Sequence, residues 1–388
     1  MLNLNLTTSE MFLSEVLCHR DYLDIPKINS LFMELGEKSC FELCEKNNIT
    51  CIAFDALSFC SELKLSPYWA FSFLDTKARI TEYMVELDEV SKLLNDHKIP
   101  LIALKNSGIA RTLYPFLGAS PMGDLDVLVL KSDFRKAHRI LIDHGYIMKF
   151  RSPLEEENLD AAERGGGAEY SVNLKSGHHL WFELQWRPIA GRWIRAGQEP
   201  AAEDLMFRSI KIDGCYTRLL SAEDNLMQVA LHTAKHTYVR APGFRLHTDV
   251  DRIVRSIDID WYKFITEVKK IKVKTAVYLS LALAKSLLRT PIPEFVLEEL
   301  QPGRVKTKVL LGWLLRVGLF DPDGKKWSRV GYIIFVCLLY DNFSELFKSI
   351  FPSEKIIREQ YPNDNDKPLF WLYSVRMLGL VKNRVVVK

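Results

Sequence analysis

Residues 123–129 read Gly-Asp-Leu-Asp-Val-Leu-Val, and this stretch predicts a strand that is buried on one side. Alternate residues of a strand share a face, so Asp124 and Asp126 project together while Leu125 and Val127 point into a core. Two neighbouring carboxylates repel each other and lose hydration, and a bound divalent cation relieves both costs. An Asp-x-Asp pair also occurs at solvated strand ends, so its meaning depends on the surrounding sequence.

A second candidate strand carries a third acidic residue. Residues 181–186 read Trp-Phe-Glu-Leu-Gln-Trp, with Glu183 inside an apolar alternation. Glu183 joins the aspartate pair if this strand lies beside the first, and it faces solvent if the strand does not. Trp181 and Trp186 fall on opposite faces, so the alternation leaves both alternatives open.

On both sides of these two strands, short apolar runs and turn residues predict a small sheet in the middle of the chain. Residues 99–104 form an apolar run entered through a proline, and residues 105–108 are expected to break it. The other expected elements are a short helix at 109–114, a loop at 115–123, a strand at 124–130, a helix at 134–144 ending at Gly145, a solvated insertion at 151–167, and a hairpin of 168–174 with 179–187.

Helical patterns dominate both sides of this sheet. Thr8 and Ser9 offer an N-cap for a first helix, and residues 68–97 carry an apolar stripe at helical spacing. From about Ser221 onward the patterns are helical again. We therefore predict an α+β fold with a small mixed β-sheet core at 99–215, flanked by a helical region at 1–98 and a helical domain at 216–388.

Composition limits the partners and the compartment. A formal net charge of +3 over 388 residues, with no Lys/Arg block, does not call for a nucleic-acid partner. The seven cysteines lack paired spacing, which favours reduced thiols and a cytoplasmic location. No signal-peptide pattern occurs at the N-terminus, and the apolar stretch at 332–340 is about half the length that crosses a bilayer.

Several motifs together resemble one family. The stretch 101–146 reads LIALKNSGIARTLYPFLGASPMGDLDVLVLKSDFRKAHRILIDHGY, and Glu-Leu-Gln-Trp-Arg follows at 183–187. Ala-Glu-Asp at 222–224, His-Thr-Ala-Lys-His at 232–236 and the tail FPSEKIIREQYP complete the pattern. The combination resembles a bacterial nucleotidyltransferase family often encoded beside peptide and natural-product pathways, which looks like a branch of the DNA polymerase β-type superfamily.

The resemblance implies an enzyme that transfers a nucleoside monophosphate from an NTP, with ATP expected, to a hydroxyl of a small-molecule or peptide acceptor. Pyrophosphate leaves. The implied metal ligands and catalytic residues for Mg²⁺ or Mn²⁺ are Asp124, Asp126 and Glu183. The implied nucleotide-binding residues are Lys105, Asn106, Ser107, Gly108 and Gly123.

Two departures from the family pattern keep an alternative open. Lys105-Asn106-Ser107-Gly108 stands where the family has Lys-Gly, and Glu183 stands where aspartate is commoner. A catalytically degenerate nucleotide-binding regulatory protein of the same fold is therefore the alternative. A glycosyltransferase, which also uses Asp-x-Asp, is disfavoured because about 98 helical residues precede the motif rather than a nucleotide-binding α/β half.

Three further residues have no assigned role. His232 and His236 lie four apart and therefore share a helix face, but no third ligand stands at a recognisable spacing for zinc. They are expected to pack, to hydrogen-bond or to contact the acceptor. Asp249 is a candidate to orient a base or substrate, and Thr248 is a candidate cap for the next helix.

Overall fold

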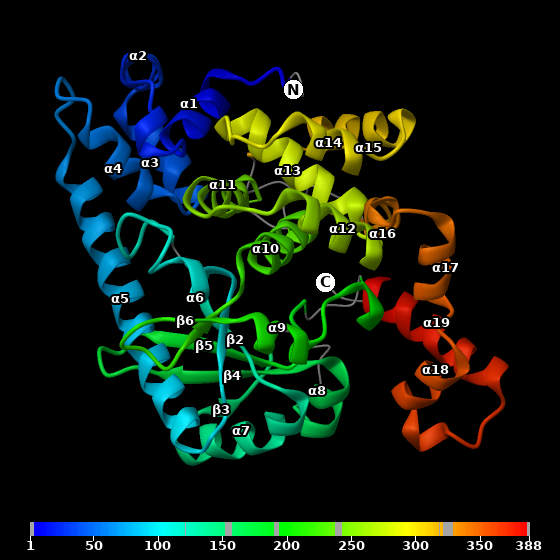
Figure 1. The fold of residues 1–388 in the computed structure, drawn as a ribbon. Helices are drawn as coiled ribbons and strands as arrows, with labels where there is room; N and C mark the ends of the chain where they lie inside the picture. The colour runs from blue at the N-terminus through cyan, green and yellow to red at the C-terminus, as the bar shows by residue number, and fades with distance from the viewer. Residues whose placement is uncertain are drawn as a thin grey trace.

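The computed structural model describes residues 4–120, 122–151, 157–189, 194–236, 243–317, 319–320 and 329–385. Helices come first, a seven-stranded sheet follows, and helices fill the rest of the chain (Figure 1). The predicted α+β class is confirmed. Among the described helices, none is both long enough and apolar enough to cross a membrane.

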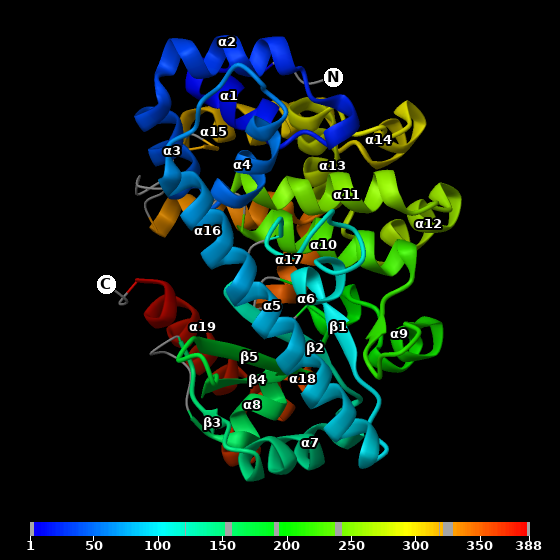
Figure 2. The same cartoon turned by 90° about the vertical axis from the view of Figure 1, so that its left-hand side faces the viewer.

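The N-terminal region is helical, as predicted. Its elements are α1 (Thr8–Val16), η1 (Arg20–Tyr22), α2 (Ile25–Leu35), α3 (Glu37–Lys46), α4 (Thr50–Ser58) and α5 (Pro67–Asp96). The cap of α1 is Thr7, not Thr8 or Ser9, because Thr7 and Glu10 form a reciprocal capping box. The long helix α5 runs along the sheet (Figure 2), and its apolar stripe joins the core beneath the sheet.

The sheet has the strand order β3-β4-β5-β2-β1-β7-β6. The strands are β1 (Ile102–Leu104), β2 (Asp124–Leu128), β3 (Ile147–Met148), β4 (Gly167–Asn173), β5 (His179–Gln185), β6 (Ile210–Lys211) and β7 (Arg218–Leu219). The predicted hairpin is β4–β5, and β2 lies parallel to β5 and antiparallel to β1. The strand that carries Glu183 is therefore a direct neighbour of the strand that carries the aspartates.

Different helices cover the two faces of the sheet. They are α6 (Lys105–Ile109), α7 (Lys131–Asp143), α8 (Leu159–Gly165), η2 (Ala196–Gln198) and α9 (Ala202–Arg208). One face packs Leu125, Val127 and Phe182 against α5 and α7. On the other face, Leu205 and Met206 of α9 belong to a small core that contains Leu104 and Leu128. Because Leu128 is the last residue of β2, the start of this strand lies outside the small core.

Two predicted elements near the sheet were misplaced. The short helix expected at 109–114 begins at Lys105 instead, because Lys105 turns the chain directly with a left-handed φ of 50°. The insertion expected at 151–167 contains α8, whose N-cap Asn158 accepts hydrogen bonds from the backbone of Asp160 and Ala161. Residues 152–156 of this insertion lie outside the described residues.

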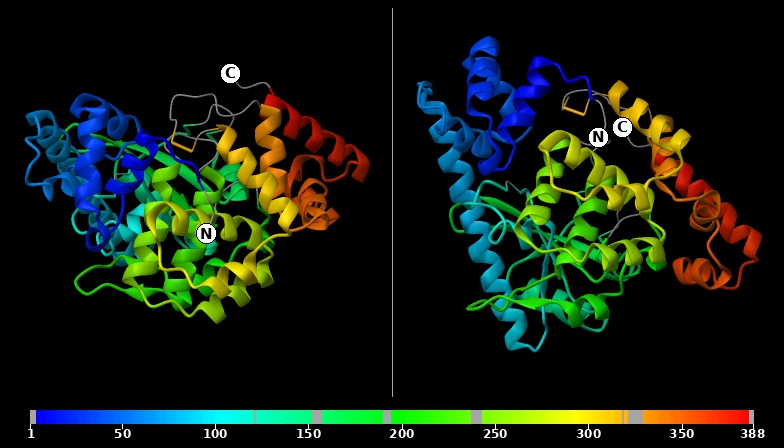
Figure 3. Two further views of the ribbon diagram at one scale, coloured as in Figure 1. Left: turned by 90° about the horizontal axis from the view of Figure 1, so that it is seen from above. Right: turned by 45° about the horizontal axis from the view of Figure 1, so that its top comes forward.

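The rest of the chain is helical. Its elements are α10 (Ala222–His236), η3 (Phe244–Leu246), α11 (His247–Ser256), α12 (Trp261–Ile271), α13 (Lys274–Leu288), α14 (Glu294–Leu300), α15 (Arg304–Val317), α16 (Arg329–Leu339), α17 (Phe343–Ile350), α18 (Glu354–Gln360), η4 (Pro362–Asp364) and α19 (Leu369–Val385). Helix α1 shares the apolar core of α10, α11 and α13. Figure 3 shows α17–α19 on the side of the molecule away from α5.

Candidate active site

The acidic residues gather on the sheet face that carries α9, beyond that helix. Asp126 lies opposite Glu183 in the β2–β5 register, and Glu183 lies opposite Glu169 in the β4–β5 hairpin. Asp124 is two residues before Asp126 and therefore shares its face. We call these four residues (Asp124, Asp126, Glu169 and Glu183) the acidic face. Asp126 is almost wholly buried, with its side chain 5% exposed.

Arg151 binds three of these carboxylates at once. Its Nη1 lies 2.6 Å from Asp124 Oδ2, its Nε donates to Glu169 Oε2 at 3.0 Å, and its Nη2 bonds Glu183 Oε1. Its backbone N–H also donates to Glu169 Oε2, at 2.9 Å. Asp124 and Glu183 thus converge on one guanidinium, although they come from different strands.

Lys105 supplies a second cation to the acidic face. Its Nζ lies 2.5 Å from Asp126 Oδ1 and 3.7 Å from Glu183 Oε2. A non-glycine residue with positive φ is strained, and such strain is commonly found at functional sites. The backbone N–H of Lys105 donates to Gln228 Oε1 at 3.1 Å, so α10 helps to hold this turn.

Gln185 completes the inner edge of the acidic face. This side chain is 2% exposed, and its Nε2 donates to Asp126 Oδ1 at 3.0 Å and to Glu183 Oε2 at 2.8 Å. The amide nitrogen must point this way, because the amide oxygen would meet two anions. Gln185 Oε1 is then buried, and no described residue hydrogen-bonds to it.

The expected phosphate loop is mostly occupied by internal contacts. Ser107 Oγ accepts the backbone N–H of Asp126 at 2.8 Å, and Asn106 Nδ2 donates to Ser120 Oγ at 2.6 Å. A Cβ on Gly108 would stand 2.8 Å from the carbonyl oxygen of Ala103, so this glycine permits close packing of α6 on β1. These side chains position β2 and α6.

Gly123, the remaining predicted nucleotide-binding residue, lies at the entrance to β2. It is exposed, and a Cβ added there would meet no atom within 4 Å. The structure therefore leaves open space beside Gly123 at the start of the acidic face. Its role in binding nucleotide stays a prediction.

Asp249 is bound inside the fold and not to the acidic face. It accepts the Tyr114 hydroxyl at 2.5 Å and the Asn106 amide at 3.1 Å, and burial raises its pKa. This network joins α6 to α11. The rings of His232 and His236 lie 4.5 Å apart on α10, and their roles stay open.

Burial and neighbouring charge act on the groups of the acidic face in opposite directions. Burial raises the pKa of Asp124, the Asp126 charge raises it further, and Lys105 and Arg151 draw it down. Burial alone would lower the pKa of Arg151, but the carboxylates of Asp124 and Glu169 hold it above its usual value. The shifts are those of a dense cluster of opposite charges.

The donor set suits a hard divalent cation. Glu183 shares Arg151 with Asp124, and it shares Lys105 and Gln185 with Asp126. Mg²⁺ and Mn²⁺ prefer such carboxylate oxygens as ligands. In the described part of the chain, no group of three or more His, Cys, Asp or Glu is already arranged as a metal site. Arg151 and Lys105 stand at the oxygens that a metal would use.

Three participants of this face were not predicted from the sequence. Glu169 had a usable signal, because the turn at 175–177 fixes the hairpin register that places it opposite Glu183. Gln185 follows Glu183 by two residues and therefore shares its face. Arg151 had no signal, since its approach depends on the pairing of the edge strand β3 with β4.

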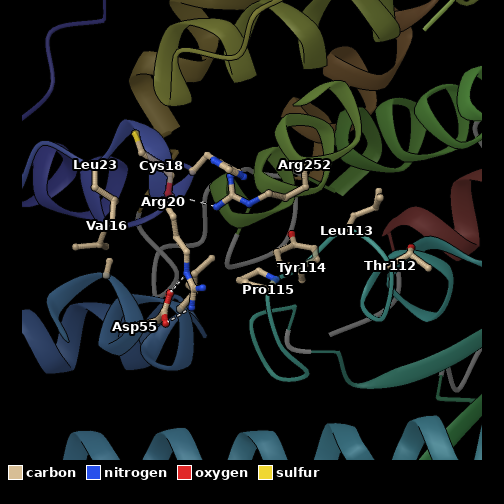
Figure 4. A pocket seen from close by; sticks show the side chains of 13 residues that line it. Val16, Cys18, Arg20, Leu23, Asp55, Thr112, Leu113, Tyr114, Pro115 and Arg252 are labelled. Carbon is tan, nitrogen blue, oxygen red and sulfur yellow. Dashed lines mark hydrogen bonds and ion pairs between the residues drawn. The ribbon is translucent and has the colours of Figure 1, made fainter. Parts of the chain in front are cut away.

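A separate cavity of about 200 Å³ lies between the N-terminal helices, the loop after α6 and α11 (Figure 4). Arg20 reaches across it to Asp55, with Nε 2.8 Å from Oδ2. Asp124, Asp126 and Glu183 do not line it. Its wall includes Tyr114, whose hydroxyl donates to the buried Asp249.

The sequence model of a family described as "Uncharacterised nucleotidyltransferase" matches residues 38–289, which include α5, the whole sheet and α10 to α13. No curated protein and no solved structure matches the chain.

Proposed function

The chain belongs to this uncharacterised nucleotidyltransferase family, and we propose that it transfers a nucleoside monophosphate from an NTP to a hydroxyl of a small-molecule or peptide acceptor. The observation that carries this proposal is the register of β2 and β5. It sets Asp126 directly opposite Glu183 and places Asp124 on the same face of the sheet.

Asp124, Asp126 and Glu183 would hold Mg²⁺ or Mn²⁺. When bound, such an ion neutralises triphosphate charge and stabilises the oxygens that attack and leave. Gln185 and Ser107 fix Asp126 through its carboxylate and its backbone N–H, so the ligand set is held before substrate arrives. Lys105 Nζ would move from Asp126 to phosphate oxygens as they approach.

The chemistry is an in-line displacement at the α-phosphorus. The acceptor oxygen forms the new bond to phosphorus, the bond to the pyrophosphate oxygen breaks, and the hydroxyl proton passes to Glu183. Glu183 suits this role because it is half-buried, whereas Asp126, its partner in the β2–β5 register, is buried. ATP is the expected NTP.

The setting of the reaction is also proposed. The buried cysteines Cys18, Cys40, Cys44, Cys51 and Cys60 are free thiols, which favours the reducing cytoplasm. The acceptor is expected to approach the acidic face from the helical side of the molecule, with no need for nucleic acid or membrane.

One observation favours a second candidate, a non-catalytic nucleotide-binding regulatory protein. The carboxylates are already bound by Arg151 and Lys105, which is how a protein without a metal would satisfy them. Such a protein would bind ATP with Mg²⁺ and never turn it over. Calorimetry alongside a turnover assay separates the two candidates.

A screen of the four NTPs with Mg²⁺ or Mn²⁺, read by pyrophosphate release, tests the enzyme. Acceptors should include hydroxyl-bearing metabolites and peptides, with a chelator as the control for metal dependence. We expect release that requires both metal and acceptor. Tight ATP binding without release, across all acceptors, would support the regulatory protein instead.

A further inference from the structure

Arg151 stands where the proposed reaction needs a metal, and it uses most of its guanidinium to do so. Nη1, Nη2 and Nε bind Asp124, Glu183 and Glu169 respectively, which belong to three different strands. Asp124 and Glu183 are two of the three proposed metal ligands. A divalent cation coordinated by these two residues would need the oxygens that Arg151 now occupies.

The backbone of Arg151 is anchored independently of those two ligands. Its N–H donates to Glu169 Oε2 at 2.9 Å, and the preceding ladder contact is Lys149 N–H to the Glu169 carbonyl at 3.0 Å. Arg151 itself lies beyond β3 in a bend, so its side chain can turn without opening the sheet. Releasing Asp124 and Glu183 would leave the anchor at Glu169 intact.

The guanidinium also lies against an aromatic ring in its present position. Its Cζ lies 5.5 Å from the centre of the Trp181 ring, and Trp181 is the register partner of Asp124. The Arg151 side chain is 35% exposed, so it borders solvent at the entrance to the acidic face. A planar guanidinium matches phosphate oxygens in the same two-pronged way as it matches carboxylates.

We propose that Arg151 is an exchanging counter-cation, which holds Asp124 and Glu183 when no metal is bound and moves onto the triphosphate when the metal–nucleotide complex enters. This inference rests on the proposed function. The guanidinium and a divalent cation compete for the same oxygens, so metal alone binds weakly. A triphosphate brings the anionic oxygens that give Arg151 a new partner, so metal and nucleotide bind together.

Arg151→Gln tests the exchange, because the exchange predicts two effects of opposite sign. Mn²⁺ without nucleotide should bind the variant about tenfold more tightly, a difference of ~1.4 kcal/mol, since its competitor is gone. A non-hydrolysable ATP analogue at saturating Mn²⁺ should bind the variant about tenfold more weakly. A residue that only supported the fold would not separate these two affinities. Calorimetry and Mn²⁺ paramagnetic resonance measure both.

Arg135→Gln is the matched control, because Arg135 also binds two carboxylates, Asp160 and Glu163, but on α7 away from the acidic face. It should leave both affinities unchanged. If wild type binds Mn²⁺ and Arg151→Gln binds it no more tightly, or binds the analogue equally well, the exchange is wrong and the metal site stands. If neither protein binds Mn²⁺, both the exchange and the metal site are wrong.

Discussion

The acidic face of the sheet and the polar row of α11 both bury carboxylates, but they satisfy them differently. The polar row of α11 is made of residues that are each less than 5% exposed: His247, Thr248, Asp249, Asp251 and Arg252. Asp251 is bound by Arg252, Arg255 and Thr290, so its charge is neutralised inside the fold. Across the sheet, four carboxylates of the acidic face share two cations.

This difference distinguishes a region that stabilises the fold from a region that can bind a ligand. A buried carboxylate with a complete set of donors has no capacity left for a ligand, and removing it costs stability. A face with more anions than cations retains negative charge that a bound cation can use. Replacing residues in the two regions should therefore produce opposite patterns, with activity lost from one and stability lost from the other.

The largest effect is expected from Asp126→Asn. Pyrophosphate release should fall about a thousandfold or more, equivalent to ~4 kcal/mol of transition-state stabilisation, because a metal ligand loses its charge. The loss of unfolding free energy should be smaller than this loss, because the amide keeps the shape of the carboxylate and relieves its repulsion with Asp124 and Glu183. Asp124→Asn should behave alike, and Asp160→Asn, outside the acidic face, is the control. Unchanged turnover in either of the first two would remove the site assignment.

Asp251→Ala should show the reverse pattern. Arg252 and Arg255, whose side chains are 4% and 6% exposed, would lose their buried partner, at a cost of about 3–5 kcal/mol in unfolding free energy. Urea denaturation measures this loss, with the exposed Asp258→Ala as the control. A loss below about 1 kcal/mol would show that the polar row of α11 does not stabilise the fold.

A pH series examines the same helix through His247. Burial lowers its pKa from 6.5 to about 4, so the imidazole is neutral in the folded protein and charges more readily when unfolded. Its contribution to stability is present above pH 6.5 and is lost as the pH falls toward 4. At pH 5 the loss should be about 2 kcal/mol.

His247→Asn isolates this contribution, because the asparagine amide can donate to the Ser280 carbonyl, which lies 3.3 Å from His247 Nδ1. Urea denaturation of wild type and variant at pH 7 and pH 5 gives, for each protein, the slope of unfolding free energy against pH. The variant should lose less stability on acidification. Equal slopes would contradict a depressed histidine pKa.

The smallest effect is expected from Tyr114→Phe. The change removes the hydroxyl that donates to Asp249 and lies 3.0 Å from Thr248, and should cost about 1–2 kcal/mol in unfolding free energy. Tyr262→Phe, on an exposed ring, is the control. A loss of nucleotide affinity larger than the loss of stability would mean that the Asp249 network contacts substrate and does more than join α6 to α11.

The sequence predicted those parts of the site that follow from local periodicity. The alternation around Asp124 and Asp126, and the one around Glu183, each encode a strand, and both strands exist and lie side by side. The apolar stripe at 68–97 likewise predicted α5 to within a residue at each end. These patterns repeat along the chain and need no knowledge of distant contacts.

What was missed depends on contacts between distant segments. The helix at Lys105 was placed too late, because Gly108 was interpreted as a break when it serves close packing on Ala103. Arg151 reaches the acidic face only through the pairing of β3 with β4, which no motif encodes. The cap of α1 was misplaced because Thr7, Thr8 and Ser9 are all good caps, and only Thr7 has glutamate three residues later.

We propose that Asp124, Asp126 and Glu183 together bind one divalent cation or a pair of them. Crystals grown with Mn²⁺ and a non-hydrolysable ATP analogue, measured near the manganese absorption edge, locate the metal directly. We expect an anomalous peak bound by carboxylate oxygens of all three residues, with Arg151 turned toward the phosphates. A peak elsewhere, or none at saturating Mn²⁺ with Arg151 still on Asp124 and Glu183, would contradict it.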